Sequence, residues 1–458
     1  MTIATGVAAP GADDAGERLR WSEMLRLGAV QAAIGAVVVL MTSTMNRVMI
    51  VELGLSASIP GLLVALHFGV QLALRPRMGF GSDQGGRRTP WILWGMAVLA
   101  LGGIGAALSV RLMQTSVTLG VLCAGIAFVV LGAGVSAAGT PLLALGAERA
   151  GASQRAATAA VMWILMIVGF AVTAGTVGQL LDPFSFDRLV RVTAAVCVVA
   201  ALVAAVAIRG VERARPSRVP FTTPVPEADE PRFARAVRSV WGEPSARTFA
   251  LFVFVAMLAY SAQDLILEPF GGVAVGRTPG ETTKLSGMQH GGVLIGMILT
   301  AVVGSRLGAL RTWATAGCAA SAASFVLLAA TPLGASVATF RAVVFVLGFS
   351  NGVFAIGAIG SMMAMTGGGA ERHAGLRLGV YGAAQAVAYA IGGFAGAAAL
   401  DVARALTGTP VTAYVTVFLG VGVLFAAAAV LAARSGARET AGAVLATRAG
   451  SLMTVARS

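Results

Sequence analysis

Twelve apolar stretches occupy most of the sequence, and they restrict what the chain can fold into. A helix needs roughly twenty apolar residues to cross the hydrocarbon core of a bilayer, so stretches of this length predict membrane-spanning helices. The chain is therefore expected to be an all-α polytopic membrane protein. The predicted spans are residues 27–51, 57–75, 91–110, 117–145, 156–181, 189–209, 248–270, 286–304, 312–331, 337–365, 378–400 and 411–433.

Composition agrees with a membrane protein and excludes several other classes. Hydrophobic residues make up 57% of the chain and charged residues only 12%, which does not describe a soluble surface. The 33 basic residues lie in short gaps between apolar stretches instead of on one polar domain, so nucleic-acid binding is not expected. Cys123, Cys197 and Cys318 lie within apolar stretches without metal-ligand spacing, so neither a disulfide framework nor a zinc site is predicted.

The distribution of basic residues predicts the orientation of the chain. An even number of spans places both termini on one side, and the gaps on that side hold most of the arginines, so both termini are expected in the cytoplasm. Residues 1–20 are polar and lack the apolar segment of a signal peptide, so they are expected to form a cytoplasmic tail. The opposite side carries these basic residues: Arg47, Arg111, Arg188, Arg191, Arg277, Lys284, Arg341 and Arg404.

One long polar interruption, residues 210–247, divides the spans into six and six. Its prolines prevent a continuous helix. We therefore expect an N-terminal six-helix half at 21–209, a basic Pro-rich cytoplasmic linker at 210–247, a C-terminal half at 248–433 and a cytoplasmic tail at 434–458.

The two halves also share residues at a constant offset. Adding 223 to the residue number takes His67 to His290 and carries the run Gly146 to Arg149 onto Gly369 to Arg372. Related halves around an axis along the membrane normal are typical of transporters whose binding region lies between the halves near the midplane.

The gap between the second and third spans has the sequence RPRMGFGSDQGGRRTP, from Arg75 to Pro90. Its glycines allow tight turns, its one acid faces several guanidiniums, and Pro90 can open the next helix. A loop that only fixes topology would account for the arginines but not for this spacing. The loop resembles the one between the second and third helices of the major facilitator superfamily, which implies that superfamily's fold and a cytoplasmic latch between helices. The expected latch residues are Gly79, Asp83, Gly86, Arg87, Arg88, Glu148, Arg155, Glu371 and Arg377.

Polar clusters interrupt three of the spans, and a fourth carries a histidine. A charged group at mid-bilayer costs roughly 2.5–3.5 kcal/mol on insertion scales, so such groups normally face a cavity or a partner. We expect these residues to line a cavity or meet a partner, with the acids at the outer ends of their spans and His290 close to the outer end of the eighth. The residues are Asn46, Arg47, Glu52, His67, Gln71, Gln263, Asp264, Glu268 and His290.

Two hypotheses concern individual residues in this set. Asp264 and Glu268 are four residues apart and share a helix face, so they repel unless one is protonated or a cation lies close. Arg47 is the candidate cation; the alternative is that all three groups are solvated among the headgroups. His67 is a candidate ligand for the magnesium of a chlorin, with polar contacts inside the bundle as the alternative.

Three runs taken together are similar to one branch of the superfamily, the PucC and LhaA type of light-harvesting complex assembly protein, which delivers bacteriochlorophyll in purple phototrophic bacteria. The resemblance covers about Trp21 to Arg434 and is nearer to the core-antenna type, because the loop from Arg75 to Pro90 lacks a longer insertion. The runs are MNRVMIVELG, RPRMGFGSDQGGRRTPWI and QDLILEPFGG.

The resemblance implies an assembly factor and not an enzyme, located in the bacterial inner or intracytoplasmic photosynthetic membrane. It implies no intrinsic cofactor, with bacteriochlorophyll as cargo. The implied partners are membrane lipids, light-harvesting antenna polypeptides and pigment-synthesis enzymes. The alternative function is a secondary transporter that exports a small amphipathic molecule by alternating access.

Overall fold

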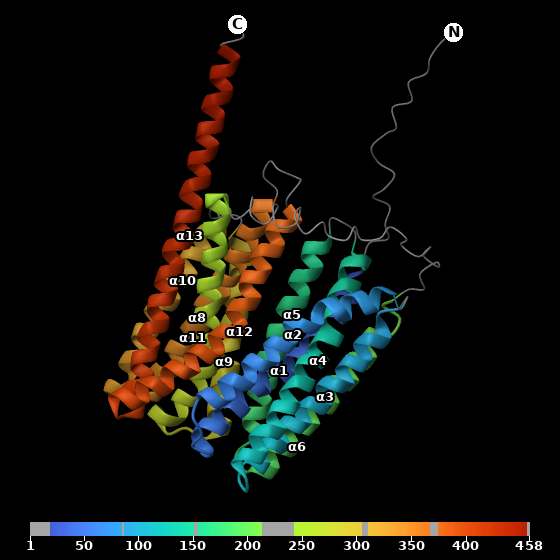
Figure 1. Ribbon diagram of the computed structural model, residues 1–458, viewed down its shortest axis with the longest axis vertical. Helices are drawn as coiled ribbons and strands as arrows, with labels where there is room; N and C mark the ends of the chain where they lie inside the picture. Colours follow the sequence, from blue (N-terminus) through green and yellow to red (C-terminus); the bar gives the residue numbers. More distant parts are fainter. Residues whose placement is uncertain are drawn as a thin grey trace.

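The structure is a computed structural model that describes residues 19–84, 87–150, 154–212, 242–304, 310–366 and 374–455. Within these ranges the regular secondary structure is helical, and 12 helices are long and apolar enough to cross a membrane. The predicted all-α membrane fold with twelve spans is therefore confirmed. Figure 1 shows two helical bundles side by side, one coloured blue to green and the other yellow to red.

The N-terminal bundle begins with a helix whose winding changes from α-helical to π-helical along its length. The helix α1 is α-helical at first and continues as two π-helical segments, η1 and η2. The elements are α1 (Trp21–Val39), η1 (Leu40–Met45), η2 (Val48–Glu52), α2 (Ser58–Gln84), α3 (Thr89–Leu112), α4 (Val117–Arg149), α5 (Arg155–Leu180) and α6 (Phe186–Ile208).

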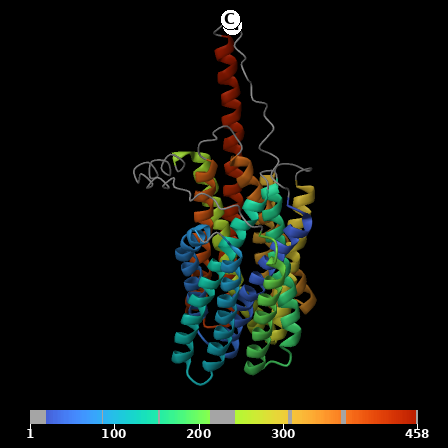
Figure 2. The same cartoon turned by 90° about the vertical axis from the view of Figure 1, so that its right-hand side faces the viewer.

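The C-terminal bundle ends in the longest helix, α13, which projects beyond the other helices in both views (Figure 1, Figure 2). We call the end from which α13 projects the inner end, following the predicted cytoplasmic termini. The elements are α8 (Pro244–Val275), α9 (Pro279–Val303), α10 (Leu310–Ala330), the 3-10 turn η4 (Thr331–Leu333), α11 (Val337–Thr366), α12 (Ala374–Thr407) and α13 (Pro410–Val455).

The two bundles repeat the same contacts. In the first, α1 packs against α5 and α6, and α3 against α4; in the second, α8 packs against α12 and α13, and α10 against α11. Gly134 and Gly357, which are 223 residues apart, each bring their helix against the backbone of its neighbour, at Leu99 and Ala314. A side chain at either position would separate the helices. The duplication in the sequence is therefore a duplication of the fold.

The halves meet where α5 packs against α9, where α2 packs against α12, and where η1 and η2 pack against α8, with η1 also against α9. Glycines make the first contact close, because a Cβ on Gly287 would lie 2.8 Å from the amide nitrogen of Gly175, and one on Gly178 would lie 2.7 Å from the carbonyl oxygen of Gly280. Small residues allow such close approach in lipid, where burial of apolar surface alone gives helices no preferred neighbour.

Candidate binding site between the two halves

Arg47 is buried near the outer end of the seam between the halves, at 2% exposure. In a π-helical turn the hydrogen bond reaches the fifth residue, so residues five apart lie on one face. Arg47 accordingly forms an ion pair with Glu52 across η2. Its Nη2 donates to the carbonyl oxygen of Arg277 in the other half, at 2.7 Å. The expected pairing of Arg47 with Asp264 or Glu268 is therefore wrong, because the π-helical winding supplies a carboxylate from the same segment.

Glu268 is surrounded by hydroxyl groups from both halves. Ser43 of η1 donates to one carboxylate oxygen. Thr283 and Thr282 of α9 donate to the other, at 2.9 and 3.3 Å. Thr44 of η1 lies 3.2 Å from the hydroxyl of Thr283. Sequence reasoning missed these hydroxyls, since serine and threonine are common in apolar spans and no spacing marks them.

Asn46 connects the halves through a backbone group that a proline leaves free. Pro269 lies inside α8 and has no amide hydrogen, so the carbonyl of Leu265, four residues earlier, lacks its helical donor. The side-chain amide of Asn46 donates to this carbonyl oxygen at 2.6 Å. A backbone group in lipid needs a partner within the protein, and here a side chain of the opposite half provides it.

Two further carboxylates join the halves at the outer rim. Asp401 of α12 accepts from the backbone amides of Ala57 and Ser58, at 2.9 and 2.7 Å. Asp182, between α5 and α6, accepts from Lys284 of α9 at 3.0 Å. Sequence reasoning identified neither acid as a contact between the halves, because both stand at helix ends without a motif. Together with the contacts above, they close the outer end of the seam.

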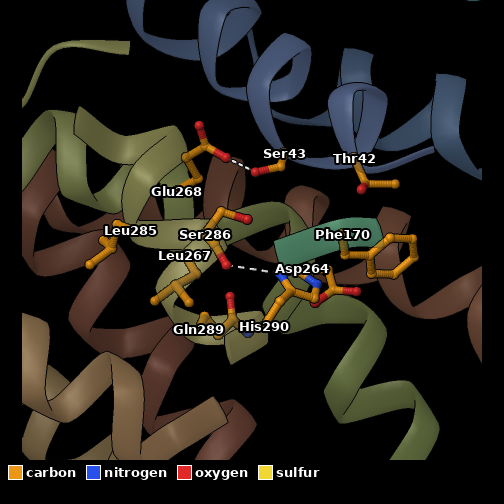
Figure 3. A pocket seen from close by; sticks show the side chains of 10 residues that line it. All are labelled: Thr42, Ser43, Phe170, Asp264, Leu267, Glu268, Leu285, Ser286, Gln289 and His290. Atoms are coloured by element: carbon orange, nitrogen blue, oxygen red, sulfur yellow. Dashed lines mark hydrogen bonds between the residues drawn. The ribbon is translucent and has the colours of Figure 1, made fainter. Parts of the chain in front are cut away.

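A pocket lies in this seam, lined by residues of η1, α5, α8 and α9 (Figure 3). Its free volume is about 30 Å³, enough for one or two water molecules. Asp264 lies eleven residues before α8 ends at Val275, and His290 eleven residues after α9 begins at Pro279. At 1.5 Å per residue both stand about 16 Å along the helix axis from the outer helix ends.

Asp264 and His290 thus lie about three helical turns inside their helices, whereas Glu52 stands at the outer end of its segment as expected. The helix α9 begins at Pro279, well before the predicted span that started at residue 286. Pro279 occupies the first turn, and Thr278 and Glu281 form a capping box that starts the helix early. The earlier start places His290 farther inside its helix than the sequence predicted.

Asp264 and Glu268 both line the pocket, in agreement with their spacing on one helix face. Glu268 has its hydroxyl donors, whereas the carboxylate of Asp264 has no hydrogen-bond partner in the part of the chain that the structure describes. An acid at this depth without a partner is expensive in a bilayer. Asp264 is therefore the residue that most needs water, a proton or a ligand in the pocket.

Three of the predicted cavity residues lie inside their own halves instead. His67 is 1% exposed, and its Nε2 accepts from the amide of Gln71 at 2.7 Å. Gln71 in turn accepts from Arg75 at 2.6 Å. Gln263 is buried in the C-terminal half, where it accepts from Asn351 at 3.0 Å. The structure thus favours polar contacts inside the bundle for His67 over an open ligand position.

At the inner end the structure brings two predicted latch residues together. Arg88 donates from Nε and Nη2 to the two carboxylate oxygens of Glu148, at 3.1 and 2.6 Å, and from Nη1 to Ser82 at 2.7 Å. Ser82 donates to the carbonyl of Gly79 at 2.8 Å. A bidentate guanidinium–carboxylate pair fixes both distance and orientation, so it holds the start of α3 against the end of α4. Arg87 is exposed.

Glu212, which the sequence did not point to, binds the backbone at the start of α3 in the same region. It accepts from the backbone amides of Arg88 and Thr89, at 2.6 and 2.8 Å, and so caps α3 with a negative charge. The remaining predicted latch residues lie outside the described residues or have side chains that do, and their role stays a prediction. They are Asp83, Gly86, Arg155, Glu371 and Arg377.

A family model and two relatives compared by sequence agree with one another. The family model described as PUCC protein matches residues 44–438. The chain is 47% identical over 428 residues to the bacteriochlorophyll synthase 44.5 kDa chain of Rhodobacter capsulatus, covering 92% of this chain and 98% of that one. It is 32% identical over 440 residues to Protein PucC of Cereibacter sphaeroides, covering 91% of this chain and 92% of the relative.

Solved structures of transporters share the fold. The nucleoside transporter NupG superposes with a TM-score of 0.66 at 11% identity, covering 90% of this chain and 99% of that one. A bacterial homologue of the human peptide transporters PepT1 and PepT2 superposes with a TM-score of 0.63 at 15% identity, covering 90% and 97%. These similarities show the major facilitator fold and leave the cargo open.

Proposed function

The chain belongs to the PucC protein family, and on this premise we propose that it is an assembly factor for light-harvesting antenna complexes that binds or delivers bacteriochlorophyll. It is a multi-pass protein of the bacterial inner membrane. A relative that is 47% identical is named as a chain of bacteriochlorophyll synthase, which supports a pigment as the cargo. The core antenna is the favoured target, because the loop from Arg75 to Pro90 lacks a longer insertion.

The observation that carries this proposal is the pocket between the halves. An imidazole and a carboxylate, His290 and Asp264, line it about three helical turns inside their helices. Polar groups at this depth are expensive unless they meet a ligand. A magnesium chlorin offers a metal with an open axial position and carbonyl oxygens at its rim, and it is otherwise apolar enough to reach the site through the membrane.

The protein is proposed to hold and pass on its cargo without breaking a bond. Its fold is that of transporters, which bind and release cargo. The name of the synthase relative supports a position beside the enzymes that make the pigment. The proposed partners are therefore pigment-synthesis enzymes on one side of the transfer and antenna polypeptides on the other, within the surrounding lipid.

A second candidate function is secondary transport of a small amphipathic molecule. The fold favours it, and so does Asp264, an acid without a hydrogen-bond partner in the described part of the chain, at the depth where transporters bind protons and substrate.

Purification of the full chain from a phototrophic host in mild detergent tests the first proposal against the second. A far-red bacteriochlorophyll band, together with antenna polypeptides in the same fractions, is the expected result. The variant Asp264→Asn should reduce the bound pigment, whereas Asp187→Asn, at an exposed pair with Arg111, should not. Colourless protein that moves protons across vesicles only when a substrate is added would refute the assembly role and support transport.

A further inference from the structure

The pocket between the halves is small and is lined mainly by polar side chains. Its free volume of about 30 Å³ admits one or two water molecules. The seam beside it is tightly closed, because a Cβ on Gly287 would lie 2.8 Å from the amide nitrogen of Gly175. Empty cavities in proteins are apolar, whereas a buried water needs two to four polar partners. The occupant that fits the closed seam is therefore water, and a larger molecule can reach these groups only after the halves separate.

Two hydrogen-bond acceptors in the pocket have no donor among the described residues. The first is the carboxylate of Asp264. The second is Nε2 of His290. Its Nδ1 lies 2.8 Å from the carbonyl oxygen of Ser286, which can only accept, so the ring proton is on Nδ1 and Nε2 carries a lone pair (Figure 3). Water in the pocket can donate to both acceptors.

The same pocket contains a donor without an acceptor. Gln289 is 4% exposed, lines the pocket, and has a buried Nε2 with no hydrogen-bond partner in the described part of the chain. Unpaired buried donors are rare in native structures, and ordered water commonly satisfies them. One or two waters that accept from Gln289 and donate to Asp264 and His290 would satisfy all three side chains.

The charges around Asp264 favour a proton in this site. Asp264 and Glu268 share one helix face, and two carboxylates in one site repel unless one of them is protonated. Arg47, the nearby cation of the η1–η2 segment, is already paired with Glu52. Three hydroxyls donate to Glu268 and none to Asp264, so a proton bound on this face goes to Asp264. The remaining titratable groups that face Asp264 are His290 of α9, Tyr260 of α8 and Tyr389 of α12.

We propose that Asp264 binds a proton when the seam is closed, and that one or two waters connect its carboxyl group to Nε2 of His290 and to the amide of Gln289. Thr42, Ser43 and Phe170 of the N-terminal half cover the pocket. When the halves separate, water reaches Asp264, and its charged form is no longer desolvated. Closing of the seam therefore takes up one proton from solution, and opening returns it.

This linkage has a definite sign. The closed seam holds one proton more than the open seam, so a lower pH favours closing and a higher pH favours opening. The site goes beyond the proposed function, because it would regulate the seam of a pigment carrier and of a transporter alike.

Infrared difference spectra between acidic and alkaline pH test the proton site on the full-length protein in lipid nanodiscs. The wild type should show the carbonyl stretch of a buried protonated carboxyl group, and Asp264→Asn should lack it. Asp187→Asn is the matched control at an exposed pair and should keep the band. In His290→Ala the band should remain but shift in frequency, because the water chain loses its imidazole acceptor.

Spin labels measure the linkage at the outer ends of the two halves. Gln114 follows α3 and Leu333 lies in η4, and both are exposed. Cysteines at these positions, with Cys123→Ser because Cys123 is only partly buried, carry the labels. Alkaline pH should shift the wild-type distances to longer values. Asp264→Asn, which resembles the protonated acid in shape and charge, should keep the short distances at every pH.

Three results would each overturn the proposal. The carboxyl band persists in Asp264→Asn, or it is unchanged in frequency in His290→Ala. The distances of the wild type do not change with pH, or those of Asp264→Asn change as much as those of the wild type.

Discussion

The hydrogen bond from Asn46 to the carbonyl of Leu265 allows a quantitative test of how the halves are joined. Pro269 removes the helical donor for that carbonyl, and Asn46, itself fully buried, replaces it at 2.6 Å. The substitution Asn46→Ala leaves the carbonyl without a donor. In the double variant Asn46→Ala with Pro269→Ala, the new amide at position 269 can restore the ordinary helical bond.

The expected change in the free energy of unfolding follows from the loss of this hydrogen bond and from the cost of leaving the Leu265 carbonyl unpaired. Hydrogen bonds between membrane helices contribute on average about 0.6 kcal/mol and at most about 1.7, while a buried acceptor left unpaired costs about 1–3 kcal/mol. The Oδ1 of Asn46 has no partner among the described residues, so its removal offsets part of the loss. We therefore expect Asn46→Ala to lower the free energy of unfolding by about 1 kcal/mol, and Pro269→Ala to recover most of it.

The assay is reversible unfolding in mixed detergent micelles of the wild type, both single variants and the double variant. Pro141→Ala in α4 is the control, because it also replaces a proline inside a helix but should be additive with Asn46→Ala. The reasoning is refuted if Asn46→Ala and Pro269→Ala are additive within about 0.3 kcal/mol, because the two sites would then share no carbonyl.

Two further predictions concern the contacts that hold the seam closed. Asp401→Asn should weaken the contact between α12 and the start of α2, since a neutral side-chain amide accepts less strongly than a carboxylate from the backbone amides of Ala57 and Ser58. Hydrogen exchange of these two backbone amides should become faster. Asp187→Asn, at an exposed pair, should leave their exchange rate unchanged. Gly287→Ala should lower the free energy of unfolding by about 1–3 kcal/mol, because its Cβ meets the backbone of α5. At Gly291 a Cβ meets nothing within 4 Å, so equal melting temperatures of the two alanine variants would contradict this account.

Two features of the site are marked by local signals in the sequence. Thr278, Pro279 and Glu281 form a helix-start signal that lies before the predicted eighth span. This signal places His290 eleven residues inside its helix instead of close to the helix start. Pro269 likewise marks Leu265 as a carbonyl in need of a donor. The donor itself, Asn46, belongs to another helix far away in the chain, and no local pattern connects the two.

The sequence by itself determined the twelve spans and the related halves, because apolar length and internal repetition are properties that each segment carries on its own. Only the tertiary structure decided which polar groups meet. His67 and His290 stand at equivalent positions, yet the free nitrogen of each depends on what neighbouring residues donate or accept. Arg47 pairs with Glu52 because η2 winds as a π-helix. Hydrogen bonds have direction, so the partner of a buried polar group follows from the geometry of all the helices around it.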